Sequence, residues 1–175
     1  MNMAIAEKGL MVLDCTAHGK SGHAARNEGE NAIYKALKDI EWFRTFQFPK
    51  QSEILGPVKM TTTIISAGTQ HNVIPDICSF SVDIRSTDTY SNIEILEIAK
   101  QHIESEITPR STRLNSSFID GNHPIVKRGK ELGKTTFGSP TLSDQALMPF
   151  PSLKMGPGDS ARSHSADEYI LIEEI

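Results

Sequence analysis

Hydrophobic and polar residues alternate in two segments of the chain, residues 9–17 and 78–85. A period of two places successive side chains on opposite faces of a strand, so both segments predict strands with one face in the core. Residues 60–67, rich in Thr and Ile, predict another strand, and alternation over residues 112–118 predicts a short last one. The predicted core positions of the first two segments are Met11, Leu13, Cys15, Ala17, Cys78, Phe80, Val82 and Ile84.

Two further segments carry the spacing of amphipathic helices. The first covers about residues 29–44, with apolar residues at positions 33, 36, 37 and 40. The second follows Ser91, which forms a capping-box pattern with Glu94, and Pro109 is expected to stop it. Its apolar residues are expected near one face: Ile93, Leu96, Ala99, Ile103 and Ile107. The order strand, helix, strand, strand, helix, strand predicts an α+β fold. We expect a ferredoxin-like βαββαβ sandwich of four antiparallel strands with both helices on one face.

Residues 119–175 follow a less regular pattern. A short helix is expected at residues 122–134, a loop at 135–150, a short strand at 151–155 and the opening of an amphipathic helix at 169–175. These residues are too few and too irregular to enclose a core. They therefore predict an incomplete part of a second domain, an α/β unit whose other part lies elsewhere.

Composition limits the possible functions. The chain has 175 residues and a net charge of −4, which gives no electrostatic reason to expect nucleic acid as a partner. No apolar run approaches the ~20 residues of a membrane helix, and no basic segment precedes an apolar one at the N-terminus. We expect no membrane partner and a cytoplasmic protein, with Cys15 and Cys78 as buried free thiols.

Two histidines are candidates for chemistry. His23 follows Gly22 where a strand crosses to a helix, a place where side chains project from a fold. His164 lies in a loop rich in Gly and Ser, where a neutral imidazole suits zinc. Each histidine can equally be a surface residue. Zinc catalysis also needs about three protein ligands, so His164 alone is not a metal site.

Three other polar residues are candidates for ligand binding. Arg85 ends a strand on its polar face, where it can bind a carboxylate or simply pair with Asp83 or Asp88. Asn72 precedes Val-Ile-Pro in a turn, and asparagine there often bonds its own backbone. Ser143, followed by an aspartate, also reads as an ordinary helix cap.

In combination these motifs are specific, and they occur in one order along almost the whole chain. The chain resembles the zinc-dependent acylamino-acid deacylases, a family that groups acetylornithine deacetylase, succinyl-diaminopimelate desuccinylase, aminoacylase and the glutamate carboxypeptidases. The ending looks closest to acetylornithine deacetylases. The motifs are Gly19-x-x-Gly22-His23-Ala-Ala25, Asn72-Val-Ile-Pro-Asp76, Asp83-Ile-Arg85, Ser143-Asp144 and Gly156-Pro-Gly158 with His164 and Asp167-Glu168-Tyr169.

The resemblance implies a division of the chain and a role for each candidate. Residues 1–8 would be a linker from a catalytic half, 9–118 a lid that makes a homodimer, and 119–175 the C-terminal part of the catalytic domain. His23 would be catalytic, stabilising the oxyanion in the partner subunit's site. His164 would bind metal, and the substrate-binding residues would be Asn72, Arg85, Ser143 and Gly158.

The implied reaction is hydrolysis of an N-acyl amino acid by zinc-bound hydroxide, with two zinc (or cobalt) ions and N-acetylornithine as the first candidate substrate. The family's other metal ligands and its general-base glutamate match positions before Met1, so we expect this chain alone to be inactive. Thr141-Leu142 stands where relatives often carry Gly-Thr. Three alternatives stay open: an activity like that of succinyl-diaminopimelate desuccinylase, a dimerisation and substrate-binding module without catalysis, and a regulatory amino-acid-binding domain.

Overall fold

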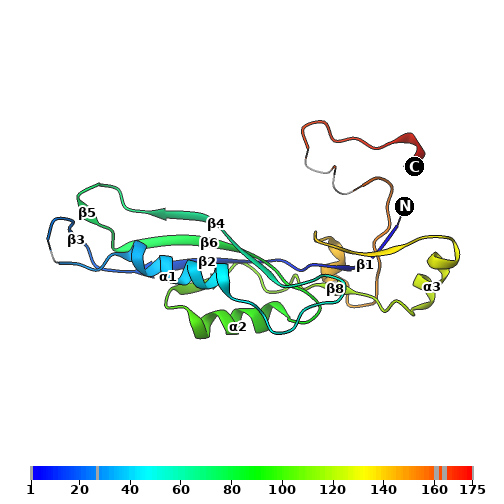
Figure 1. Ribbon diagram of the computed structural model, residues 1–175, viewed down its shortest axis with the longest axis horizontal. Coiled ribbons are helices and arrows are strands. Elements are labelled where there is room, and N and C mark those ends of the chain that lie inside the picture. The colour runs from blue at the N-terminus through cyan, green and yellow to red at the C-terminus, as the bar shows by residue number, and fades with distance from the viewer. Residues whose placement is uncertain (1, 27, 160–161, 163–164, 175) are drawn as a thin grey trace.

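The computed structural model describes residues 2–26, 28–159, 162 and 165–174. The described chain is elongated, with a four-stranded sheet and two helices at one end and a small three-stranded sheet at the other (Figure 1). Both chain ends lie near the small sheet. The candidate residues are therefore spread along one long body.

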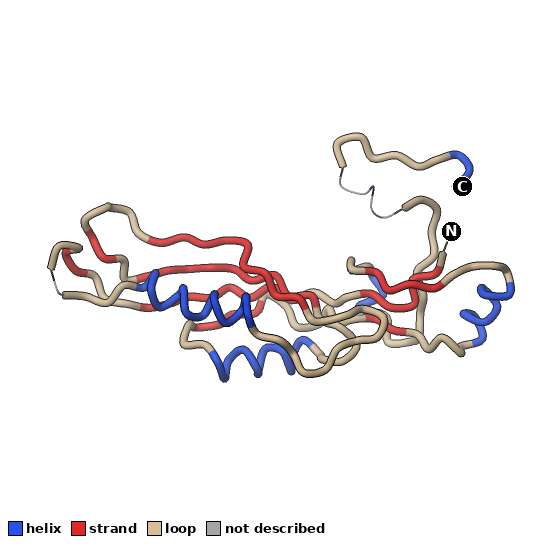
Figure 2. Tube along the Cα trace, in the orientation of Figure 1, coloured by secondary structure: helices blue, strands red, loops and turns tan. Residues whose placement is uncertain are grey.

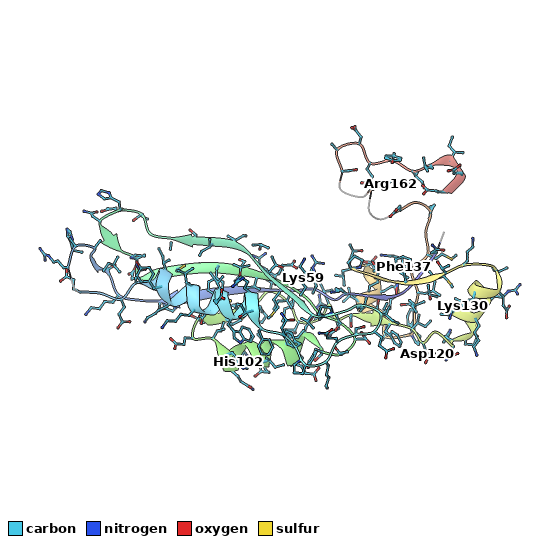
Figure 3. All side chains as sticks on the ribbon, in the orientation of Figure 1. Lys59, His102, Asp120, Lys130, Phe137 and Arg162 are labelled. Atoms are coloured by element: carbon cyan, nitrogen blue, oxygen red, sulfur yellow. The ribbon has the colours of Figure 1, made fainter. Side chains whose placement is uncertain are left out.

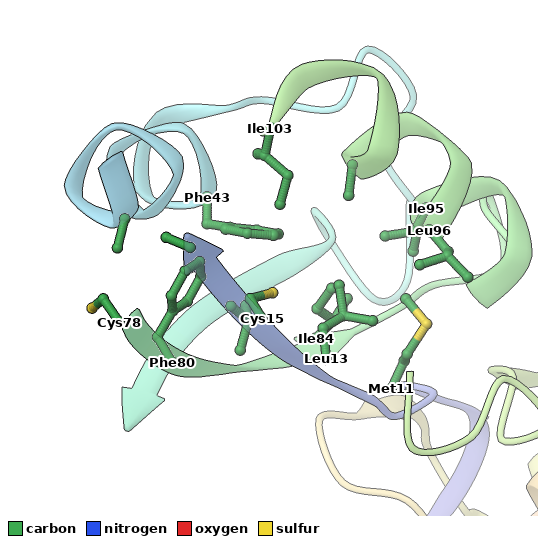
Figure 4. Close-up of a cluster of buried hydrophobic side chains, with 14 of the residues drawn as sticks. Met11, Leu13, Cys15, Phe43, Cys78, Phe80, Ile84, Ile95, Leu96 and Ile103 are labelled. Carbon is green, nitrogen blue, oxygen red and sulfur yellow. The ribbon is translucent and has the colours of Figure 1, made fainter. Parts of the chain in front are cut away.

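The four-stranded sheet consists of β2 (Met11–His18), β4 (Lys59–Ala67), β6 (Ile77–Arg85) and β7 (Glu106–Pro109). Its order is β4-β6-β2-β7, and every neighbouring pair is antiparallel. Helices α1 (Ala32–Thr45) and α2 (Asn92–His102) cover one face of this sheet (Figure 4). This confirms the expected ferredoxin-like fold class.

The core between sheet and helices comes from the alternating strands. All eight core positions predicted for β2 and β6 are buried, while their neighbours along the strands lie on the open face. The helices add Phe43, Ile95 and Leu96, which lie against Phe80, Leu13 and Met11 in the same cluster (Figure 4). Each fully buried large apolar side chain contributes about 1.5–3 kcal/mol, so this cluster stabilises the fold.

Side-chain caps set the starts of both helices. The Asn31 side chain accepts a hydrogen bond from the Ile33 amide (2.9 Å) and begins α1. Ser91 and Glu94 form the predicted capping box at the start of α2. On α2 the expected positions Leu96, Ala99 and Ile103 are buried. The expected face is wrong at the start of the helix, where Asn92 is buried and Ile93 is 59% exposed.

The last strand of this sheet lies earlier than predicted. Helix α2 ends at His102, and residues 106–109 form β7 instead of continuing the helix. Pro109 lies in this edge strand opposite Leu13, a place where a missing backbone donor is tolerated. The strand predicted at 112–118 is reduced to β8 (Ser117–Phe118), which belongs to the other sheet.

The second sheet corrects two other expectations. Residues 1–8, expected as a linker, contain β1 (Met3–Glu7), and the expected loop at 135–150 contains β9 (Thr136–Ser139). Strand β1 lies between β8 and β9, antiparallel to the first and parallel to the second. All five residues of β1 are buried, so the strand shows no alternation. A strand buried on both faces escapes a search for period two.

A short helix, α3 (Pro124–Glu131), covers the second sheet, in line with the helix expected at 122–134. Its Val126 joins a small core with Met3, Ile5 and Ile119. The strand expected at 151–155 is limited to one bridge between Ala4 and Lys154.

Near the C-terminal end the described residues include the 3-10 turns η1 (Asp144–Leu147) and η3 (Ile172–Glu174). The second stands where an α-helix was expected. Among the described residues, no helix has the length and apolar character that crossing a bilayer requires.

Candidate substrate-binding site

A two-stranded ribbon at the far end of the four-stranded sheet carries His23 and Asn72 (Figure 2). It pairs β3 (Gly22–His23) with β5 (Val73–Ile74), and His23 lies opposite Val73. The Asn72 carbonyl accepts a hydrogen bond from the Ala24 amide (3.0 Å). Two residues that are far apart in sequence therefore lie together at this end, which we call the tip ribbon.

Glycines make this conformation possible. A Cβ atom at Gly22 would lie 2.7 Å from the Glu28 carbonyl oxygen, closer than real side chains approach. Gly29 has φ of +85°, in the region that favours glycine. The chain can therefore turn back sharply between β3 and α1, which leaves His23 exposed.

The His23 ring has one nitrogen already in use. Its Nδ1 accepts a hydrogen bond from the Ala25 amide (3.1 Å). A neutral imidazole that accepts at Nδ1 carries its proton on Nε2, which is then a donor. Nε2 has no hydrogen-bond partner among the described residues, so it can donate to a group outside this chain.

Beside the tip ribbon lies a cavity of about 430 Å³. It is lined by Ala24, Asn31 and Ile33 together with residues of the connection from Ala67 to Pro75. Its walls mix apolar side chains with the amides of Asn31 and Gln70.

Arg85 lies at the opposite end of the sheet. It ends β6, whose first residue, Ile77, adjoins the tip ribbon. Nine strand residues span about 26 Å at roughly 3.3 Å each. Arg85 is bonded to Asp83 through Nε (2.8 Å) and Nη2 (3.1 Å), the pairing expected as the ordinary alternative. One chain therefore does not bring His23, Asn72 and Arg85 together.

Ser143 lies beside the second sheet and caps η1, as an ordinary reading of the sequence also expects. Its hydroxyl donates a hydrogen bond to the carboxylate of Glu7, which is completely buried in β1 and also forms an ion pair with Lys154. Sequence reasoning missed Glu7 and Lys154. Glu7 directly follows four apolar residues, and this position could have indicated that its carboxylate is buried. A buried carboxylate requires hydrogen-bond or charged partners.

Gly158 has φ of +86° and lines a cavity of about 910 Å³ between β9 and the C-terminal segment. Arg162, Tyr169 and Glu174 also line this cavity. Arg162 forms an ion pair with Glu174, and its guanidinium lies 4.9 Å from the centre of the Tyr169 ring.

His164, the predicted metal ligand, is outside the described residues. Within the described part of the chain, no group of three or more His, Cys, Asp or Glu side chains could hold a metal ion. The described residues therefore do not assemble the two-ion centre that the sequence resemblance implied.

Comparison with known families gives a direct assignment. The peptidase dimerisation domain, known as the M20 dimerisation domain, matches residues 5–110, more than half of the chain. The chain belongs to the M20 peptidase dimerisation-domain family. The matched region contains the four-stranded sheet, both of its helices and the tip ribbon. Two solved structures with a similar fold are described as an M20 family metallo-carboxypeptidase of Sulfolobus solfataricus and a dinuclear metal-binding M20 peptidase of Bacillus subtilis, with TM-scores of 0.60 and 0.55 and identities of 12% and 19%.

Known relatives of this M20 chain are about twice its length. An uncharacterized metallohydrolase of Methanocaldococcus jannaschii is 25% identical over 99% of this chain and 52% of its own length. A succinyl-diaminopimelate desuccinylase of Corynebacterium glutamicum is 22% identical over 96% of this chain and 49% of its own. Among solved structures, aminopeptidase PepT from Bacillus cereus matches with a TM-score of 0.73 and 20% identity, over 99% of this chain and 50% of that one. The M20 chain thus spans about half the length of the relatives it matches.

Proposed function

We propose that the full-length protein is a metal-dependent hydrolase that removes the acyl group from an N-acyl amino acid. Acetylornithine or its N-succinyl analogue is the candidate substrate. In this proposal residues 9–118 are the lid, and residues 119–175 are the C-terminal part of the catalytic domain. Membership of the M20 family and relatives that act as hydrolases support the reaction class.

The observation that carries the proposal is the separation of His23 and Asn72 from Arg85. Both groups of residues suit one substrate. His23 at the tip ribbon can donate a hydrogen bond to the oxyanion, and the Arg85 guanidinium at the base of β6 can bind a carboxylate. About 26 Å of strand keeps them apart within one chain. A site that uses all three residues therefore combines the tip of one copy with the base of another.

The surface of the sheet edge supports a homodimer. β4 is an edge strand of the four-stranded sheet, and its Ile64 and Ile65 are more than half exposed. Tyr34 and Leu37 are exposed on α1, which packs beside β4. An unpaired edge strand with exposed apolar side chains favours pairing with a second copy around a two-fold axis. Such pairing is the arrangement we propose.

Within this site His23 would donate from Nε2 to the oxyanion that forms during hydrolysis. Loss of one such donor typically lowers turnover by about 10²–10³-fold. Asn72 would hold the substrate from the same tip, and Ser143 and Gly158 would line the pocket of the other copy. We propose zinc or cobalt as the metal, two ions in the full-length protein, with His164 as one ligand; the described residues do not hold such a centre.

A mixing experiment tests the two-copy site directly. His23→Ala and Arg85→Ala would each inactivate the full-length protein towards N-acetylornithine and N-succinylornithine. After dissociation and random reassociation of the two variants, half of the dimers are mixed, and each mixed dimer has one intact site. We expect about a quarter of the wild-type rate to return. A mixture as inactive as its components would refute the shared site.

The matched control is His18→Ala. His18 is another exposed histidine of the same lid, and among the described residues its only side-chain partner is Glu106 at 3.4 Å. This variant should keep its activity and dimerise normally. The alternative function, a dimerisation module without catalysis, rests on the family assignment alone and predicts dimers of the full-length protein that hydrolyse neither substrate.

A further inference from the structure

The orientation of the His23 side chain has to come from contacts close to it. The tip ribbon lies at one end of the molecule, whereas Phe137 of β9 and Arg162 lie towards the other end (Figure 3). His23 is exposed, and within the described part of the chain its ring has one hydrogen bond, accepted by Nδ1 from the Ala25 amide (3.1 Å). Packing therefore does not fix this side chain, so its direction depends on how firmly its backbone is held.

The segment that follows the turn runs back beside β3. The Lys20 amide donates to the Glu30 carbonyl and the Glu30 amide donates to the Lys20 carbonyl, both at 2.8 Å, which forms an antiparallel bridge. A Cβ atom at Gly22 would lie 3.2 Å from Cγ of Glu28. Because Gly22 has no side chain, the Glu28 side chain lies directly against β3.

The Glu28 carboxylate bonds the backbone of His23 itself. Successive amides of an extended strand point to opposite edges, and the Ala24 amide bonds the Asn72 carbonyl on the β5 side. The His23 amide points to the other edge, where it donates to Oε1 of Glu28 (3.3 Å). Nη1 of Arg26 lies 3.9 Å from the same oxygen. The carboxylate thus takes the place of a neighbouring strand at the free edge of the tip ribbon.

The backbone is held on both sides of the His23 Cα atom. The His23 carbonyl accepts a hydrogen bond from the Arg26 amide (2.9 Å), while its amide donates to Glu28. With both peptide groups held, the direction in which the imidazole leaves the strand is set. Of these hydrogen bonds, only the one to Glu28 depends on the side chain of another residue.

We propose that Glu28 is a positioning residue, whose carboxylate holds the His23 amide and so directs the imidazole towards the oxyanion in the partner subunit's site. This inference rests on the proposed function and deepens it. Glu28 acts through His23 and does not itself contact the substrate. Glutamine keeps an acceptor oxygen at the same reach and alanine removes it, so the two substitutions isolate the hydrogen bond.

The orientation of His23 in the 175-residue chain is the first test. Three-bond couplings measured by NMR report the χ1 angle of His23, and the exchange rate of its amide reports the hydrogen bond. We expect a single χ1 rotamer in the wild-type chain and in Glu28→Gln. In Glu28→Ala we expect averaged couplings and amide exchange at least about tenfold faster. Averaged couplings in the wild-type chain, or unchanged couplings in Glu28→Ala, would overturn the inference.

Glu30→Ala is the matched control. Glu30 is also an exposed carboxylate close to this turn, but its side chain pairs with Lys35 (2.6 Å). Its hydrogen bonds to Lys20 come from its backbone, which alanine retains. This variant should leave the couplings and the amide exchange of His23 unchanged. Equal effects of the Glu28 and Glu30 substitutions would mean a general loosening of the turn and would also overturn the inference.

Kinetics of the full-length protein connect this orientation with catalysis. Towards N-acetylornithine or N-succinylornithine, Glu28→Ala should lower kcat by about tenfold and change KM by less than about twofold, because His23 acts in the transition state. Glu28→Gln should keep kcat within about twofold of the wild-type value.

A double variant tests whether Glu28 acts through His23. Added to His23→Ala, Glu28→Ala should cause no further loss of the residual rate, because the group that it positions is already absent. A further tenfold loss in that background would refute a role through His23. Hydrolysis of neither substrate would refute the proposed function, whereas the couplings of His23 would still decide whether Glu28 holds it.

Discussion

Replacement of Asn92 by alanine tests how the four-stranded sheet is joined to the smaller one. Asn92 is completely buried at the start of α2. Its side-chain amide donates to the carbonyl of Leu114 (2.9 Å) and, over longer distances, to those of Leu10 (3.3 Å) and Thr112 (3.4 Å). Leu10 and Leu114 belong to the two connections between the sheets. One side chain thus holds both connections together.

The expected loss follows from these contacts. The NH₂ group has two hydrogens and makes two hydrogen bonds at a time, each worth about 1 kcal/mol of net stability. The alanine variant also leaves a small cavity, which adds to the loss. The substitution also removes Oδ1, a buried acceptor with no hydrogen-bond partner among the described residues, and this offsets part of the lost stability. We expect the free energy of unfolding to fall by about 2–3 kcal/mol.

Urea unfolding measures this loss. The single tryptophan, Trp42 of α1, packs against Phe43 and against Phe46, which caps the end of the helix, so its fluorescence reports the unfolding of the domain that contains the four-stranded sheet. The matched control is Ile93→Ala at the neighbouring, mostly exposed position, which should change stability by less than about 0.5 kcal/mol. A larger loss for Ile93→Ala than for Asn92→Ala would refute the structure of this helix face.

Three further predictions concern charge, thiols and assembly. Hydrogen bonds from Arg110 and then Ser81 lower the pKa of Asp14, so this carboxylate stabilises the fold above its ordinary range of about 4 and loses that effect as pH falls through the lowered pKa. Arg110→Met should flatten the acid-side fall in unfolding free energy, measured with urea between pH 6 and 2; an unchanged slope would contradict this. Burial raises the pKa of Cys15 to about 12, so iodoacetamide at pH 8 should modify it only in unfolded protein, as mass spectrometry can check. Ile65→Lys on the edge strand should convert dimers to monomers in light scattering, whereas Ile125→Lys on α3 should not.

The domain that contains the four-stranded sheet could be predicted from sequence because its local signals agree with its packing. Alternation in β2 and β6 matched their buried and open faces, and the Ser91 capping box formed as expected. The α2 face and its end were predicted less well. A buried asparagine took the place expected for Ile93, because its amide bonds distant carbonyls that no local pattern reveals. Residues 106–109, which were expected to continue the helix, instead form strand β7.

The smaller sheet could not be predicted because its strands depend on partners far along the chain. β1 pairs with segments more than 100 residues away, and its buried apolar run lacks any period. The candidate site shows the same limit. The sequence motifs named His23, Asn72 and Arg85 as parts of one site. Only the strand pairing shows that His23 and Asn72 lie at the tip, whereas Arg85 lies at the opposite end of β6.

The base of the sheet is held more firmly than a freely moving lid would require. Asn92 binds both connections, and a Cβ atom at Gly9 would lie 2.7 Å from the Leu114 carbonyl oxygen, so the two connections touch through their backbones. Because Arg85 ends β6 at this junction, beside the hydrogen bond from the Gly9 amide to the Ser86 carbonyl, its position relative to the smaller sheet is fixed by the same contacts. The tip ribbon lies at the other end of the sheet, where backbone hydrogen bonds such as that from the Ala32 amide to the Pro75 carbonyl (2.9 Å) join it to the start of α1. In the proposed site, Arg85 therefore acts from the copy that holds the pocket, whereas the contributions of His23 and Asn72 depend on how two copies pair.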